Sequence, residues 1–116
     1  MEIRVFLYRN ALLVATKFAG PSGDINVTIT SDYNKNGKKT RDTYTNASGN
    51  TEKEIFYEYD DLGRLAVKET VSPITATAEK IMYEYEQQES HPMHIYYLDG
   101  RGKHQKTVAI EYRQAN

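Results

Sequence analysis

Two of the three histidines lie close enough in the sequence to raise the question of a metal site. His91 and His94 are three residues apart in the stretch HPMH. On a helix this spacing allows two side chains to share a metal ion, but the intervening Pro92 opposes a helix. The sequence also contains no cysteine to complete a thiolate site. We therefore interpret this stretch as a solvated loop, and we predict neither a metal nor another cofactor.

The glycine-rich stretch LDGRGKHQK, residues 98–106, is a second candidate. Its backbone N–H groups, together with Arg101 or Lys103, could cradle a phosphate group. However, it lacks the spacing of a Walker motif, and no helical pattern follows it. A charged hairpin turn is the interpretation that this stretch favours.

Three acidic residues, Glu58, Glu84 and Glu111, recur at similar intervals. Two carboxylates on neighbouring strands could form the acid pair of a glycosidase. Acidic residues that face cations such as Arg64 or Lys68 are equally what the solvent-exposed face of a sheet needs. No serine–histidine–aspartate arrangement stands out. We predict that the protein is not an enzyme.

Tyrosine is the residue type with the clearest pattern, since the chain has ten tyrosines and no tryptophan. A series of tyrosines recurs every 26 or 27 residues. If successive hairpins stack in register, these rings form a row that can contact a sugar face or a partner protein. The alternative is that the tyrosines form the core, above all Tyr57 and Tyr83 in mid-strand. The candidate binding residues are Tyr33, Tyr59, Tyr85 and Tyr112.

The elements that position these tyrosines are expected to be β-strands. Ile55, Tyr57 and Tyr59 alternate with more polar residues, and the same alternation recurs around Ile81, 26 residues later. A period of two places the isoleucines and tyrosines on one face of a strand. The residues between them, mostly acids and threonines, occupy the other face. A helix over the alanine- and glutamate-rich stretch 74–90 is the weaker interpretation.

Turn residues divide the chain into hairpins. Asx–x–x–Gly sequences at 34–37 and 60–63 are typical of tight turns, as are GPSGD at 20–24 and NASGN at 46–50. Ser72-Pro73 is expected to end a strand. Strands are predicted at residues 2–8, 11–18, 25–33, 38–46, 53–60, 64–71, 79–86, 93–98 and 105–113. The predicted fold class is all-β, an antiparallel meander of tandem hairpins with about eight or nine strands, forming a twisted open sheet or a partly closed barrel.

Length and charge limit the remaining possibilities. A chain of 116 residues is one domain, which we place at 1–116. The net charge of −1 provides no field for nucleic acid, and no apolar run approaches the roughly 20 residues of a membrane span. We interpret the N-terminal stretch as a pair of strands and not as a signal peptide. An open sheet leaves edges and an apolar face that a second copy of the chain could cover.

The stretch YEYDDLGRL, residues 57–65, resembles the core of the YD, or Rhs, repeat, whose signature reads roughly Tyr-Asp-x-x-Gly-Arg-Leu. The matching positions are Tyr59, Asp60, Gly63, Arg64 and Leu65. The stretches at 32–39 and 83–90 keep the tyrosine and lose most of the other positions. The resemblance implies a bacterial β-sheet repeat of the cell surface or of secreted proteins. Its motif is structural, so it implies no catalytic residue.

Three functions remain open from the sequence. The first is a noncatalytic hairpin-repeat module that has a structural role or binds a protein or carbohydrate. The second is an inhibitor or immunity-type protein that binds one partner protein. The third is a small-ligand barrel, which requires a hollow interior lined by tyrosines.

Overall fold

The computed structural model describes residues 2–20 and 24–113 of the 116-residue chain. This part of the chain folds into strands and turns, without a helix. The strands are β1 (Ile3–Arg9), β2 (Leu12–Ala19), β3 (Ile25–Tyr33), β4 (Lys39–Asn46), β5 (Thr51–Tyr59), β6 (Leu65–Ser72), β7 (Thr77–Glu84), β8 (His94–Asp99) and β9 (His104–Ala109).

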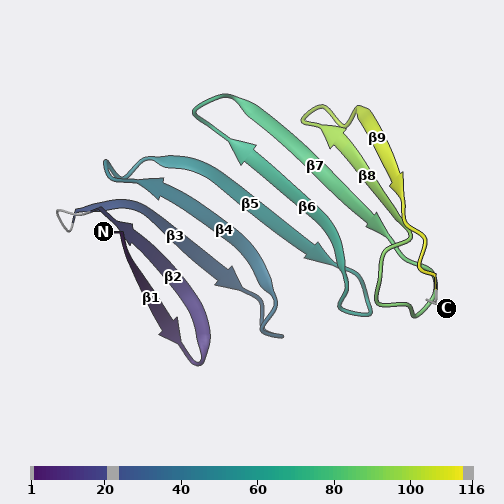
Figure 1. Ribbon diagram of the computed structural model, residues 1–116, viewed down its shortest axis with the longest axis horizontal. Coiled ribbons are helices and arrows are strands. Elements are labelled where there is room, and N and C mark those ends of the chain that lie inside the picture. The colour runs from purple at the N-terminus through teal and green to yellow at the C-terminus, as the bar shows by residue number, and fades with distance from the viewer. Residues whose placement is uncertain (1, 21–23, 114–116) are drawn as a thin grey trace.

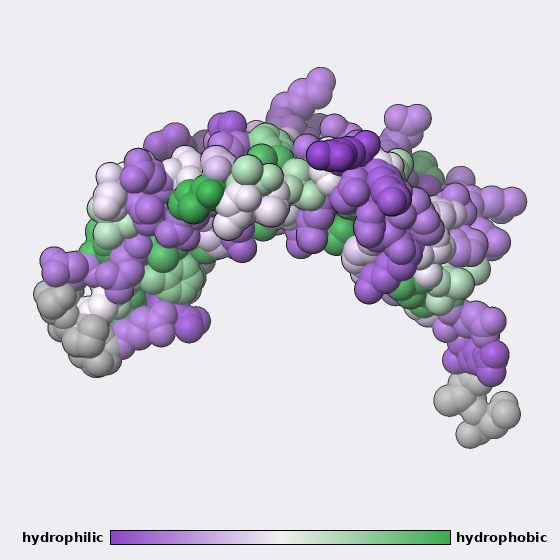
Figure 2. Space-filling view, turned by 90° about the horizontal axis from the view of Figure 1, so that it is seen from above, coloured by the Kyte–Doolittle hydropathy of each residue, from purple (hydrophilic) through white to green (hydrophobic). Residues whose placement is uncertain are grey.

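The nine strands form one antiparallel sheet in which neighbours in the chain are neighbours in space. Figure 1 shows them side by side in a single layer, from β1 in purple to β9 in yellow. Figure 2 shows the sheet bent into an arch that is hollowed on one side. The sheet is not closed into a barrel, because β1 pairs only with β2 and β9 only with β8 among the described strands. Of the two predicted architectures, the structure therefore adopts the twisted open sheet.

The register places Ile29, Ile55, Ile81 and Ile95 on one face, together with most of the tyrosines. Ile29 lies opposite Tyr44, and Ile81 lies opposite both Lys68 and Tyr97 on its two neighbouring strands. Directly opposed residues share a face of the sheet, so these pairs confirm the predicted alternation. We call this side the tyrosine face; its isoleucines and tyrosines are Ile29, Tyr33, Tyr44, Ile55, Tyr57, Tyr59, Ile81, Tyr83, Ile95 and Tyr97.

The sheet has very little fully buried core. Among the described apolar side chains, only Ala19 and Ile55 are buried, with exposed fractions of 6% and 8%. Tyr57 and Tyr83, which the sequence suggested as core residues, are half-buried. A single layer of strands has no opposing layer to cover it, so burial comes only from side chains on the same face and on adjacent strands.

Four of the turns have the same construction. In each, an Asx side chain accepts hydrogen bonds from the backbone N–H groups two and four residues later. A glycine three residues after the Asx has a positive φ, for example 78° at Gly63. Only glycine adopts this conformation without strain, so the sequence pattern and the turn geometry agree. The Asx residues are Asn34, Asn46, Asp60 and Asp99.

The predicted strands correspond closely to the observed ones. The segment 79–86, predicted as a strand in preference to a helix, overlaps β7, and Ser72 ends β6 as expected. The strand predicted at 105–113 ends earlier, at Ala109. Most of the turn predicted at 20–24 lies outside the described residues. No helix long and apolar enough to cross a membrane occurs in the described ranges.

Candidate functional site

The four candidate tyrosines share one contact. Each hydroxyl donates a hydrogen bond to the backbone carbonyl oxygen of the residue 20 positions earlier, on the preceding strand or just before it. Each bond therefore fastens the end of one hairpin strand to the hairpin before it. The pairs are Tyr33 to Leu13 at 2.7 Å, Tyr59 to Lys39 at 2.7 Å, Tyr85 to Leu65 at 2.6 Å and Tyr112 to Pro92 at 3.1 Å.

These hydrogen bonds and the strand register form one connected series across the sheet. Tyr33 lies opposite Lys39 on β4, and the carbonyl of Lys39 accepts the hydroxyl of Tyr59. Tyr59 lies opposite Leu65 on β6, and the carbonyl of Leu65 accepts the hydroxyl of Tyr85. The register shifts directly before Tyr33 and directly before Tyr59, so both tyrosines follow a β-bulge. The same local geometry is therefore built at least twice.

Asp60 and Gly63 of the motif shape the turn between β5 and β6. The Oδ1 atom of Asp60 accepts the N–H groups of Leu62 and Arg64 at 3.0 and 2.9 Å. Its Oδ2 atom accepts Nε of Arg64 at 2.8 Å. The backbone N–H of Arg64, followed by its guanidinium, lowers the pKa of Asp60, although partial burial opposes this. The turn thus favours the ionised form of the Asp60 carboxylate, and both of its oxygens accept hydrogen bonds.

Arg64 connects this turn to the next hairpin. Its Nη1 atom donates to the carbonyl oxygens of Gln87 and Glu89, at 2.7 and 2.8 Å. Its guanidinium also lies over the ring of Tyr85, 4.4 Å from the centroid. The side chain of Arg64, a residue of the motif, therefore binds the loop between β7 and β8.

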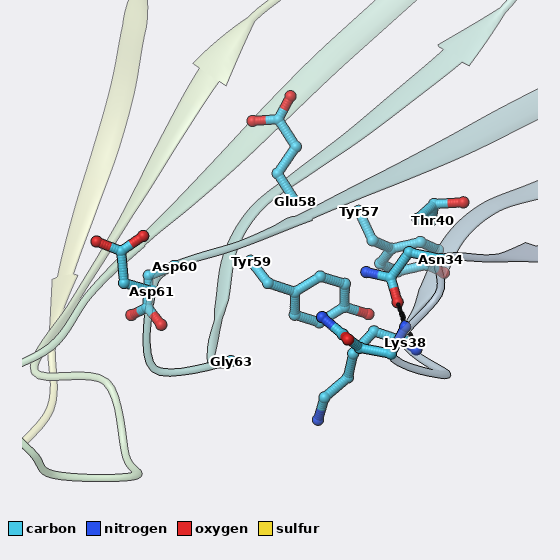
Figure 3. A pocket seen from close by; sticks show the side chains of 10 residues that line it. Asn34, Lys38, Thr40, Tyr57, Glu58, Tyr59, Asp60, Asp61 and Gly63 are labelled. Atoms are coloured by element: carbon cyan, nitrogen blue, oxygen red, sulfur yellow. Dashed lines mark hydrogen bonds between the residues drawn. The ribbon is translucent and has the colours of Figure 1, made fainter.

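The hollow beside Tyr59 is one part of this surface that could receive a ligand, and a second hollow of about 420 Å³ lies beside Tyr112. The first has a volume of about 530 Å³ and lies between the turns after β3 and β5. In Figure 3, Tyr57 and Tyr59 lie on one side of β5, whereas Glu58 lies on the other. Lys38 lies over the ring of Tyr59, 5.9 Å from its centroid. The hollow therefore combines an aromatic ring with an ammonium group and turn amides such as that of Asn34.

Cations cover several other aromatic rings of the tyrosine face. Lys53 lies 4.4 Å from the ring centroid of Tyr44, directly opposite it in the register. Lys106 lies 4.6 Å from that of Tyr97, again directly opposite. Such cation–π pairs stabilise adjacent strands and cover ring faces that would otherwise be open to a sugar. Ligand binding by the four candidate tyrosines stays a prediction. Their hydroxyls already donate to backbone carbonyls.

A buried acid on the tyrosine face was not singled out from the sequence. Asp42 on β4 is 6% exposed, and its carboxylate accepts hydrogen bonds from Ser31 at 2.6 Å and from Tyr57 at 2.9 Å. Lys39 lies 3.4 Å from the same carboxylate. Burial, followed by the hydrogen bond to Asp42, raises the pKa of Tyr57 well above its ordinary value. The available signal was the period of two, which puts Asp42 on the same face as Tyr44.

The other candidates from the sequence do not form a shared centre. His91 lies against the ring of Tyr112, with centroids 5.0 Å apart, while Nδ1 of His94 lies 3.1 Å from Oε1 of Glu84. Within residues 2–20 and 24–113, no group of three or more potential metal ligands occurs. Glu58 and Glu84 belong to different hairpins, on β5 and β7.

The glycine-rich stretch 98–106 forms the charged hairpin turn that was predicted. Oδ1 of Asp99 accepts the backbone N–H groups of Arg101 and Lys103, both at 2.9 Å. These are the groups that a phosphate would need, and the turn itself uses them.

Comparison with known proteins found no family model, no curated protein and no solved structure that matches this chain.

Proposed function

We propose that this chain is a noncatalytic β-hairpin-repeat module of the YD type, with a structural role in a bacterial secreted or cell-surface protein. In this role, the chain extends a single-layer sheet by successive hairpins and presents that sheet to a partner. The observation that carries this proposal is the repeated hydrogen bond from a tyrosine hydroxyl to the carbonyl 20 residues earlier.

The motif residues support an architectural role because each has a contact within the sheet. Tyr59 reaches back to the preceding hairpin, and Arg64 reaches forward to the next one. Asp60 and Gly63 form the turn between them. The carbonyl of Leu65 receives the next tyrosine of the series. A motif retained for ligand binding would leave some of these groups directed toward solvent.

Unfolding by urea tests the architectural role directly. Tyr59→Phe and Tyr85→Phe each remove one hydroxyl that joins two hairpins, so each should lower the free energy of unfolding by about 1 kcal/mol. Tyr44→Phe is the matched control, because the Tyr44 hydroxyl has no hydrogen-bond partner among the described residues. Full stability of both motif variants would contradict the proposal and would favour retention of these hydroxyls for a ligand.

A second function, a protein that binds one partner protein, is favoured by a different observation. All seven residues of β1 are exposed, including Val5, Phe6 and Leu7. An exposed apolar edge strand is suited to pairing with a strand of another molecule. The small-ligand barrel finds no comparable support, since the open sheet does not enclose an interior.

A further inference from the structure

Tyr8 occupies the first position of the tyrosine series. The register between β1 and β2 shifts directly before Tyr8, as it does before Tyr33 and Tyr59 between later strands. Tyr8 lies opposite Leu13, whose carbonyl accepts the hydroxyl of Tyr33. Tyr8 is thus built into the sheet in the same way as the later members.

Tyr8 differs from those members in one respect. Its hydroxyl has no hydrogen-bond partner among the described residues, and 65% of the residue is exposed. The later tyrosines each donate to a carbonyl on the preceding strand or just before it, and no described strand precedes β1. An antiparallel strand beside β1 would supply the missing carbonyl.

The two edges of the sheet differ strongly in character. On β1, the exposed fractions are 41% for Val5, 51% for Phe6 and 41% for Leu7, so both faces of this edge are apolar. On β9, the sequence HQKTVA places Lys106 and other polar residues at the edge. Charged and polar edge strands resist pairing, whereas long apolar ones favour it.

We propose that β1 pairs with β1 of a second copy of this chain, antiparallel and about a two-fold axis. Rotation by half a turn about the sheet normal reverses the direction of β1 and keeps the tyrosine face on the same side. Pairing β1 with β9 does not achieve this, because both are odd-numbered strands of a meander and run in the same direction. The symmetric contact is therefore the one that continues the antiparallel sheet.

The residues of β1 fit one register of this pairing. With Phe6 on the two-fold axis, Val5 lies opposite Leu7 of the second copy, and Arg4 lies opposite Tyr8. The second pair repeats the opposition of a cation and an aromatic ring that the sheet already shows for Arg4 with Phe18. Continuing the register between each later tyrosine's strand and the strand before it places Tyr33 opposite Leu12, Tyr59 opposite Lys38 and Tyr85 opposite Arg64. In each case the hydroxyl binds the carbonyl of the next residue along that preceding strand. The same rule assigns the Tyr8 hydroxyl to the carbonyl of Val5 in the second copy.

Light scattering coupled to size-exclusion chromatography tests this proposal on the whole chain. We expect a dimer of twice the 13.3 kDa chain mass. Phe6→Lys should abolish it by placing two ammonium groups opposite each other, whereas Thr107→Lys on β9 should leave it intact. Tyr8→Phe removes two hydrogen bonds per dimer and should weaken dimerisation roughly tenfold or more. Circular dichroism shows whether each variant is folded.

A cysteine variant checks the register independently, since the sequence contains no cysteine. Residues directly opposite each other have Cβ atoms roughly 4.5–5.5 Å apart, so Phe6→Cys should form a disulfide between copies on mild oxidation. Thr107→Cys should not. A folded wild-type chain that stays monomeric, or a dimer that survives Phe6→Lys, would overturn the proposal. The monomeric result would leave the proposed architectural function untouched.

Discussion

At the scale of single residues, hydroxyl groups carry much of the specificity of this sheet. A phenylalanine would fill the same half-buried positions, but it could not reach a backbone carbonyl. Tyr57 differs from the tyrosines that join hairpins, because its hydroxyl donates to the buried carboxylate of Asp42. Burial, followed by this contact, raises the pKa of Tyr57, so Tyr57 links the stability of the fold to alkaline pH.

The Tyr57→Phe variant should be less stable and less sensitive to alkaline pH. Loss of the Tyr57 hydroxyl leaves one carboxylate oxygen of Asp42 without its hydrogen-bond donor. The free energy of unfolding should therefore fall by about 1–3 kcal/mol at neutral pH. The folded state raises the pKa of Tyr57, so its contribution is complete below the unfolded value of about 10 and declines as pH rises above it. Urea unfolding at a series of pH values measures both effects.

The control for this prediction is Tyr44→Phe, whose hydroxyl has no described partner. This variant should keep the stability of the wild-type chain at neutral pH and its decline above pH of about 10. A Tyr57→Phe variant with an unchanged alkaline decline would show that other tyrosines dominate it.

At the scale of elements, hairpins are joined by side chains from their turns. The loop between β7 and β8 contains few backbone hydrogen bonds of its own, among them Glu89 N–H to Glu86 at 2.9 Å and Met93 N–H to Glu84 at 2.8 Å. Arg64 adds two hydrogen bonds to this loop from the neighbouring turn. The motif arginine therefore holds a segment that lies more than 20 residues later in the chain.

Arg64→Ala should loosen this loop without unfolding the sheet. The amide protons of Glu89 and Met93 should exchange with solvent roughly fivefold to tenfold faster, because the loop loses about 1 kcal/mol or more of local stability. Hydrogen exchange followed by NMR measures this. Arg41→Ala is the matched control, since Arg41 binds Asp32 on the adjacent strand and does not contact the loop. Equal exchange in the two variants would rule out this role.

The sequence predicts the elements well and their connections poorly. Alternation around Ile55 and Ile81 and the Asx–x–x–Gly turns are local signals, so strands, turns and faces follow from them. The acceptors of the tyrosine hydroxyls are backbone carbonyls of Leu13, Lys39 and Leu65. Every residue has a carbonyl, so no residue type reveals which one is used. The choice depends on strand register, which β-bulges shift.

At the scale of the whole molecule, the fold is a linear array. Each strand contacts only the strands next to it in the chain. Neither edge is covered in the described structure, and very few side chains are fully buried. In such an array, stability is close to a sum of neighbouring contacts, and the ends open more readily than the middle.

Hydrogen exchange along the chain should therefore show a gradient. Amides of β4 to β6, around the buried Ile55, should be the most protected, and those of β9 should exchange through local fraying. Ile55→Val should speed exchange throughout the central strands, with a cost of about 0.5–1.5 kcal/mol. Val108→Ala, on the tyrosine face of β9, should affect β8 and β9 alone. A sheet that unfolds as one cooperative unit would instead show the same exchange limit in every strand and the same spread for both substitutions. The gradient is expected because no second layer ties the distant strands together.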